Sequence, residues 1–183
     1  MIFAKAHKYW GGLQIGPYKA DNIYPLIPLL KQEFPNWSSE HIKSYIELII
    51  SKKDHVSGLW VAKNEAHYYV GLIIYTIQQL SSKHVYKLKG KNGKSRKKTF
   101  LDVLVVENLI ASSPILQKQI FMTLVDAVVD IAKNKSCNFV ELSSIESESF
   151  DLIKDKYQHQ ITEAKGLRSY LKLSESTTAN MET

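Results

Sequence analysis

The hydrophobic and polar residues of this chain follow three successive patterns between Thr99 and Ser144. TFLDVLVVE, which begins at Thr99, is a nearly continuous apolar run and predicts a buried strand. SSPILQKQIFMTLVDAVVDIAKNK has apolar residues at helical spacing and predicts a long amphipathic helix, with Ser113 as its N-cap and Pro114 at its first position. CNFVELSS predicts a second strand. These segments form a βαβ unit with parallel strands, and ligands of open α/β sheets bind at the carboxyl ends of such strands.

The segments before this unit predict two helices and an antiparallel hairpin. Residues 13–22 predict a short strand and a turn. Pro25 and Pro28 predict that the next helix, over residues 23–34, is kinked or is regular only after Pro28. Residues 36–53 place apolar side chains at helical spacing behind a serine cap, which predicts a second helix. Residues 58–80 contain two alternating segments around an Asn-Glu turn, which predicts two antiparallel strands.

The remaining segments complete a sheet on both sides of the βαβ unit. Gly71 is the candidate position for a β-bulge, and the basic loop 81–98 joins two strands of the antiparallel half. Residues 146–158 predict a short helix, and residues 159–173 predict a terminal hairpin. The polar tail 174–183 is expected to be disordered.

Composition indicates one soluble domain, over residues 13–173, behind an N-terminal leader over residues 1–12. The chain has 183 residues, of which 44% are hydrophobic. Its single cysteine, Cys137, excludes an internal disulfide, and the sequence has neither a long apolar run nor a cleavable apolar leader. We therefore expect a cytoplasmic protein without a membrane partner.

The net charge of +6 is concentrated in one loop. Residues 81–98 contain 8 of the 24 basic residues and no acidic residue, so the rest of the chain has 16 basic and 18 acidic residues, a balance of −2. Such a loop attracts phosphate backbones or acidic protein surfaces, although many lysine-rich hairpin tips are only solvated. The loop is thus a candidate contact for a nucleic acid or an acidic partner.

The order of the predicted elements resembles the GNAT superfamily of acetyl-CoA-dependent N-acetyltransferases over residues 13–173. The segments that carry the resemblance are LQIGPYKADN, GLWVAKNEAHYYVGLIIY, and FLDVLVVE followed by the amphipathic helix and CNFVEL. The resemblance implies an α/β (α+β) fold with a mixed, mainly antiparallel sheet, helices on both faces and a central βαβ unit. It also implies that two parallel strands part at residues 104–106, where Leu104, Val105 and Val106 would hold the pantetheine arm of acetyl-CoA.

The loop that binds the cofactor pyrophosphate in that superfamily has the pattern Arg/Gln-x-x-Gly-x-Gly/Ala. Here Gln117 stands for the leading residue, and Ile120 and Met122 occupy the glycine positions, or Gln119 and Phe121 when the alignment is shifted by one residue. In one interpretation the turn from Ser113 to Gln119, with Gln117 and Lys118, still binds phosphates at the positive end of the helix dipole. In the other, Ser-Ser-Pro is only a good helix start.

The candidate catalytic residues are Asp102, Glu141 and Tyr157. A carboxylate near the parting strands could take a proton from an ammonium acceptor, and Asp102, Glu107 and Glu141 all lie on the two strands concerned. Each could instead face solvent or pair with a lysine. Tyr157 is the tyrosine nearest to the position at which the superfamily has its general acid, and the competing interpretation is that it packs in the core.

Two functions remain open from the sequence. The first is acetyl or acyl transfer from acetyl-CoA, as co-substrate, to a primary amine of a small molecule or peptide. The second is a catalytically inactive binding or regulatory protein of the same fold that uses the hairpin 81–98. The six histidines are scattered without metal-ligand spacing, so no metal is expected.

Overall fold

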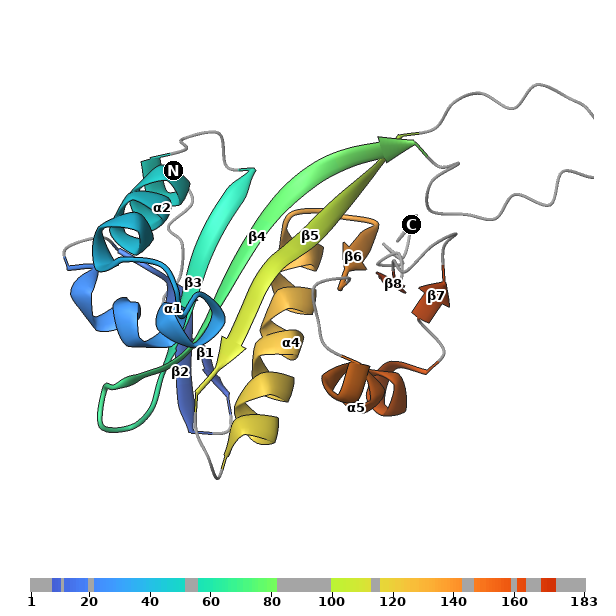
Figure 1. Ribbon diagram of the computed structural model, residues 1–183. Coiled ribbons are helices and arrows are strands. Elements are labelled where there is room, and N and C mark those ends of the chain that lie inside the picture. Colours follow the sequence, from blue (N-terminus) through green and yellow to red (C-terminus); the bar gives the residue numbers. More distant parts are fainter. Residues whose placement is uncertain are drawn as a thin grey trace, which may run out of the picture.

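The computed structural model in Figure 1 describes residues 8–10, 12–19, 22–51, 56–81, 100–112, 116–142, 147–158, 161–163 and 169–173. Its strands form one eight-stranded sheet in the order β1-β2-β3-β4-β5-β6-β8-β7. The β5–β6 pair is parallel and the other six described pairings are antiparallel, which confirms the predicted mixed, mainly antiparallel sheet. The strands are β1 (Lys8–Trp10), β2 (Leu13–Pro17), β3 (Ser57–Lys63), β4 (Tyr69–Ser81), β5 (Phe100–Ala111), β6 (Phe139–Glu141), β7 (Ile161–Glu163) and β8 (Ser169–Lys172).

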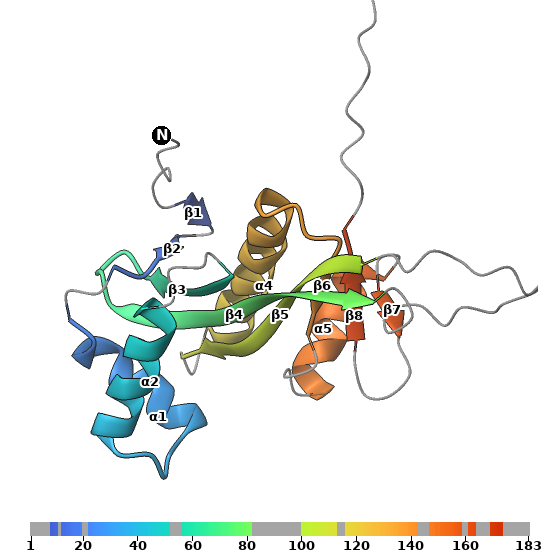
Figure 2. The ribbon, with the colours of Figure 1, turned by 90° about the horizontal axis from the view of Figure 1, so that it is seen from above.

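Two helices pack on one face of the sheet, as Figure 2 shows from above. A 3₁₀ turn, η1 (Tyr24–Leu26), leads into α1 (Ile27–Glu33), and each has a proline as its second residue, so the predicted break is confirmed. α2 (Ser39–Ser51) confirms the second predicted helix, and Ser38 Oγ accepts a hydrogen bond from the His41 N–H at 3.1 Å. Their apolar side chains pack with alternate residues of β3, β4 and β5 in one cluster.

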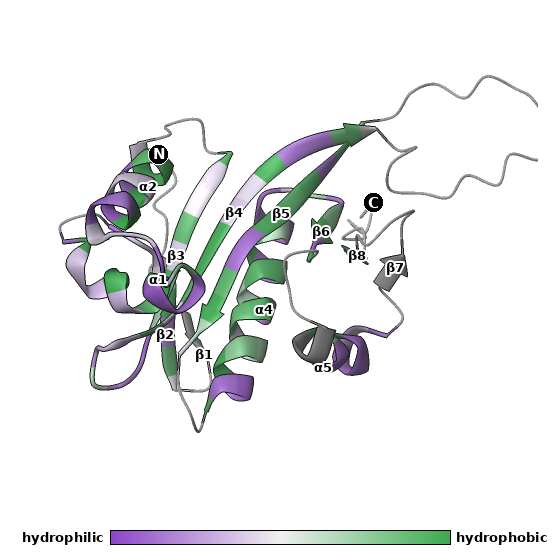
Figure 3. Cartoon of the chain, in the orientation of Figure 1, coloured by the Kyte–Doolittle hydropathy of each residue, from purple (hydrophilic) through white to green (hydrophobic). Residues whose placement is uncertain are grey.

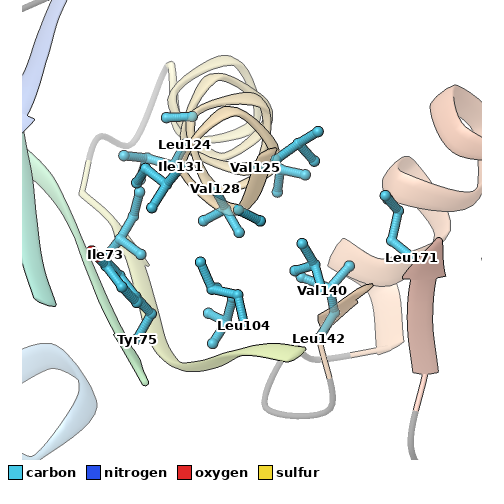
Figure 4. Packing of buried hydrophobic residues seen from close by; sticks show 14 of the residues in the cluster. Ile73, Tyr75, Leu104, Leu124, Val125, Val128, Ile131, Val140, Leu142 and Leu171 are labelled. Atoms are coloured by element: carbon cyan, nitrogen blue, oxygen red, sulfur yellow. The ribbon is translucent and has the colours of Figure 1, made fainter. Parts of the chain in front are cut away.

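The opposite face is covered by α4 (Gln117–Asn134) and α5 (Ser147–Tyr157). The apolar stripe of α4 packs on the inward residues of β4, β5 and β6, and Figure 4 shows Leu124, Val125 and Val128 over Leu104 and Val140. Gly71 lies beneath this helix, and a Cβ atom there would come within 2.8 Å of Leu124 Cδ1. Figure 3 shows α4 mainly in green along its length, with hydrophilic residues in purple at its amino end. This is the larger of the two helix-covered cores.

Two β-bulges interrupt the long antiparallel ladder. The register of β3 with β4 shifts at Ala62 and Lys63, which leaves Val70 without a Cα partner beside the predicted position, Gly71. The second shift was not predicted: Ile74 pairs with Asn108 and Tyr75 with Val106, so Glu107 is the extra residue of β5.

The two parallel strands differ greatly in length. β6 pairs with β5 over only three residues, and the last pair is Val105 with Glu141. β5 runs on to Ala111 along β4, six residues past that pair. Figure 1 shows β5 continuing away from β6 along the length of α4. The two strands therefore diverge after Val105, within the predicted range of residues 104–106.

Three boundaries differ from the sequence prediction. β1 lies inside the segment interpreted as a leader and pairs with β2. α4 begins at Gln117 with Leu116 as its N-cap and no side-chain cap, so Pro114 is not its first residue. β5 extends to Ala111, whereas the predicted strand ends at Glu107.

Several predictions fall outside the described residues. They concern Ser113, the basic loop 81–98 apart from Ser81, the turn of the terminal hairpin at 164–168 and the tail 174–183. The strands on both sides of the basic loop pair as predicted, up to Ser81 with Phe100. The terminal hairpin also forms as predicted, with β7 antiparallel to β8.

Candidate functional site

The bulge of β5 places two polar side chains beside α2. Glu107 Oε1 accepts a hydrogen bond from Thr76 Oγ1 of β4 at 3.0 Å, and Asn108 Oδ1 accepts one from the Tyr45 hydroxyl of α2 at 3.2 Å. Thr76 follows Tyr75, which packs toward α4, so Thr76 and its partner Glu107 lie on the face that carries α1 and α2. The bulge thus turns an exposed carboxylate and an amide toward the same side.

The electrostatics of this group link the helix to the bulge. Burial of the Tyr45 side chain raises the pKa of its hydroxyl, and the negative charge of Glu107 raises that pKa further. The tyrosine is therefore protonated at neutral pH and acts as a hydrogen-bond donor to Asn108. Glu107 itself is exposed and accepts the Thr76 hydroxyl, so an arriving ammonium group could still exchange a proton with it.

Glu141 lies at the last pair of the parallel strands. Its side chain is 5% exposed, and the residue stands between Val105 of β5 and Tyr170 of β8. The neighbouring Val140 packs toward α4, so Glu141 points to the opposite face, which is also the face of Glu107. Of the three predicted catalytic residues, Glu141 is the one at the divergence of the strands.

Asp102 lies elsewhere along β5. Its backbone N–H donates to Asn138 Oδ1 at 3.0 Å, and its carbonyl accepts the Asn138 N–H at 2.7 Å. Five residues of strand separate it from Glu107, about 16 Å at the usual rise per residue. Its negative charge adds to burial in raising the pKa of the Cys137 thiol to about 11. Asp102 is thus placed at the start of the parallel pairing, away from the bulge.

Tyr157 lies between the two helices of the opposite face. Its hydroxyl donates to Asp126 Oδ1 of α4 at 2.6 Å, and Lys156 Nζ bonds the same carboxylate at 2.6 and 2.7 Å. Burial and the Asp126 carboxylate raise the Tyr157 pKa far above its usual range. The geometry therefore gives this side chain a packing role and does not bring it to Glu107 or Glu141.

The amino end of α4 is the candidate site for phosphate. The first intrahelical bond is donated by Ile120 N–H to the Leu116 carbonyl at 2.9 Å, so the N–H groups of Gln117, Lys118 and Gln119 are the first-turn donors. All three side chains are exposed. Ile120 and Phe121, each of which occupies a glycine position in one of the two alignments, are instead buried in the core.

Three polar residues of this site were not identified from the sequence, namely Tyr45, Thr76 and Asn108. Glu107 was considered only as one of three carboxylates on the strands. The signal that could have found the group is the pair Glu107-Asn108, where two adjacent polar residues interrupt a run of apolar residues in the strand. Two adjacent polar residues break the alternation of a strand and are typical of a bulge.

No family model matches the sequence, and no curated protein matches it. Solved structures do match it. An aminoglycoside N-acetyltransferase in complex with CoA is 14% identical, with 96% of this chain and 99% of that one covered and a TM-score of 0.58. An aminoglycoside antibiotic 6'-N-acetyltransferase from Acinetobacter baumannii is 14% identical, with 79% and 88% covered and a TM-score of 0.54. AtaT complexed with acetyl-methionyl-tRNAfMet is 11% identical, with 87% and 94% covered and a TM-score of 0.58.

These comparisons confirm the predicted resemblance at the level of the fold. The chain has the mixed α/β fold of GNAT acetyltransferases. None of the helices in the described ranges is both long and apolar enough to cross a bilayer. Within the same ranges, no three His, Cys, Asp or Glu side chains converge as metal ligands.

Proposed function

We propose that this protein transfers an acetyl or acyl group from a CoA thioester to a primary amine. The observation that carries the proposal is the divergence of β5 from β6 after the Val105–Glu141 pair, directly before the bulge at Glu107. A strand edge that is no longer occupied by its neighbour can accept an extended ligand arm through main-chain hydrogen bonds. The thioester carbonyl would then lie next to the bulge.

The reaction needs few side chains. The amine nitrogen attacks the thioester carbonyl, a C–N bond forms and the C–S bond breaks, and the proton that the nitrogen loses goes to the Glu107 carboxylate, directly or through water. The CoA thiolate leaves and is protonated by solvent or by a site proton. Positioning of the two reactants and main-chain stabilisation of the oxyanion supply most of the rate enhancement in such a mechanism.

The phosphates of CoA would bind at the amino end of α4. Three first-turn N–H groups and the exposed ammonium of Lys118 provide donors and positive charge there. Ile120 and Phe121 fill the core behind this turn, whereas the superfamily pattern has small residues. We therefore expect fewer main-chain amides to contact the phosphates than in a loop with the superfamily pattern, and a lower affinity for CoA than such a loop gives.

Calorimetric titration with acetyl-CoA tests the proposal. We expect saturable binding and a rise in melting temperature, because a ligand that binds only the folded state stabilises it by mass action. The matched variant Lys118→Gln should weaken binding, whereas Lys172→Gln, which changes an exposed lysine at the end of β8, should not. If millimolar acetyl-CoA gives no heat of binding and does not raise the melting temperature, the proposal of an acyltransferase is contradicted.

The second candidate is a protein of the same fold that binds nucleic acid or an acidic partner through the basic hairpin. It is favoured by the eight cations without an acid in residues 81–98, and AtaT, a structural neighbour, is solved with an acetylated aminoacyl-tRNA. Deletion of residues 87–97 should then abolish a salt-sensitive association with tRNA and leave the melting temperature almost unchanged. Unchanged tRNA binding after the deletion would exclude this role for the hairpin.

A further inference from the structure

An aromatic elbow, defined here as Phe34, Trp37 and Tyr45, lies between α1 and α2. The Phe34 and Trp37 rings are stacked with their centroids 4.4 Å apart, and Tyr45 meets them edge-on at 6.1 and 5.5 Å. The backbone holds this arrangement, because the Trp37 N–H donates to the Phe34 carbonyl at 3.1 Å and Lys31 Nζ donates to the Trp37 carbonyl. The indole is thus presented by a fixed turn.

The indole contributes little to the core. Phe34 and Tyr45 pack against the buried cluster beneath α1 and α2, whereas Trp37 is not part of that cluster and remains 36% exposed. One face of its ring is stacked on Phe34. A tryptophan held in place at the surface offers a cation-binding π-face, and indole is the strongest such ring in proteins.

The charges around the elbow select a cation over a phosphate. Residues 22–51 contain two lysines and three glutamates, a balance of −1, and the bulge carboxylate Glu107 makes it −2. Both lysines are engaged, Lys31 by the Trp37 carbonyl and Lys43 by Glu47 at 3.9 Å. Glu33 and Glu40 flank the elbow in sequence, and both are exposed. A phosphate would be repelled here, and an ammonium group would be attracted.

Tyr45 connects the elbow to the bulge. Its ring contacts Trp37 and its hydroxyl donates to Asn108, the neighbour of Glu107. The indole is therefore linked through Tyr45 and Asn108 to the strand position next to Glu107. A flexible acceptor with two amino groups could place one at each end.

We propose that the acceptor carries at least two amino groups, one held as an ammonium over the Trp37 ring and the other presented to Glu107. This inference rests on the proposed acyl transfer for the role of the second amine. Trp37 is then a specificity-determining residue, because it selects diamines over monoamines without touching the reacting atoms. The expected selectivity is about 2- to 30-fold, the range that one cation–π contact supplies.

The test compares three probes with the same five-carbon chain, 1,5-diaminopentane, pentylamine and 5-amino-1-pentanol, by calorimetry and tryptophan fluorescence without coenzyme. We expect the diamine to bind at least about twofold more tightly than either analogue. Trp37→Leu should erase that preference and Trp37→Phe should keep part of it. Trp60→Phe is the matched control, because Trp60 packs against the cluster under α4.

Three results would overturn the inference: no binding of the diamine, equal affinity for the three probes, or an unchanged preference in Trp37→Leu. If the melting curve shows that Trp37→Leu does not fold, two other variants replace it. They are Trp37→Phe and the double variant Glu33→Gln with Glu40→Gln, and each should reduce the preference for the diamine. Acetyl-CoA binding is measured separately. Its absence would remove the proposed transferase, whereas loss of diamine selectivity alone would remove only the acceptor assignment.

Discussion

The two faces of this sheet are built for different purposes. The α4 face buries a continuous apolar cluster. Its polar side chains between α4 and α5 bond one another, because Tyr157 and Lys156 both donate to Asp126. The α1–α2 face has a smaller core, and Tyr45 at its edge contacts the exposed Trp37 and the half-buried Asn108, which follows the exposed Glu107. One face mainly stabilises the fold, and the other carries the side chains that could contact a substrate.

A bulge produces this difference within a single strand. Before the bulge, Val103 and Leu104 alternate between the two faces in the ordinary way. At the bulge, one extra residue lets Glu107 and Asn108 act on the same side without disturbing the core positions that follow, Leu109 and Ile110. The bulge therefore lets a buried strand carry polar side chains at one point while the positions on both sides of it stay apolar.

The largest expected effect is that of Glu107→Gln on acyl transfer. The amide keeps the shape and the Thr76 contact but cannot accept a proton, so kcat should fall by about 10²- to 10⁴-fold. Stability and acetyl-CoA affinity should hardly change. Steady-state kinetics with 1,5-diaminopentane as acceptor measure the loss, and a variant with wild-type kcat would remove Glu107 from the mechanism.

Leu124→Ala should show that the α4 face is the stabilising one. Leu124 is completely buried above Gly71, so its truncation should lower the free energy of unfolding by about 2–5 kcal/mol. Leu48→Ala on the exposed side of α2 is the matched control and should cost less than about 0.5 kcal/mol. Urea unfolding measures both, and equal losses would contradict the contribution of the α4 core to stability.

The Cys137 thiol should react slowly in the native state. Burial and the charge of Asp102 raise its pKa from 9.0 to about 11, which leaves about 100-fold less thiolate at pH 8.5 than in the unfolded chain. Alkylation by iodoacetamide, with and without urea, measures this ratio. The native state holds the proton more tightly, so this group makes stability fall between about pH 9 and pH 11, and Cys137→Ala should lessen that fall.

Tyr157→Phe should affect stability more than catalysis. The variant loses the hydrogen bond to the Asp126 carboxylate, which should cost about 1–2 kcal/mol at this half-buried site. Tyr24→Phe, at an exposed tyrosine, should cost nothing measurable. A large fall in kcat with unchanged stability would instead support the general acid that the sequence suggested at Tyr157.

The elements with long, regular patterns could be predicted from the sequence. Apolar spacing located α2 and α4, the two prolines located the break before α1, and alternation located the β3–β4 hairpin. These features depend on local spacing, because one buried face fixes the period of the residues that form it. The parallel pairing of β5 with β6 followed from the βαβ order.

The site could be predicted only in part. The divergence of the strands near residue 105 was predicted, but the bulge at Glu107 depends on the register against Ile74 and Tyr75, which lie over thirty residues away. The contact of Tyr45 with Asn108 joins residues 63 apart in sequence, and no local pattern encodes it. The same applies to Tyr157, whose partner Asp126 lies on another helix.

Amide hydrogen exchange with and without acetyl-CoA tests most directly whether the thioester enters where β5 leaves β6. The account predicts slower exchange in two segments only, residues 104–108 of β5 and residues 116–119 at the start of α4, with α1 and α5 unaffected. Protection elsewhere, or unchanged exchange in both segments at saturating acetyl-CoA, would contradict it.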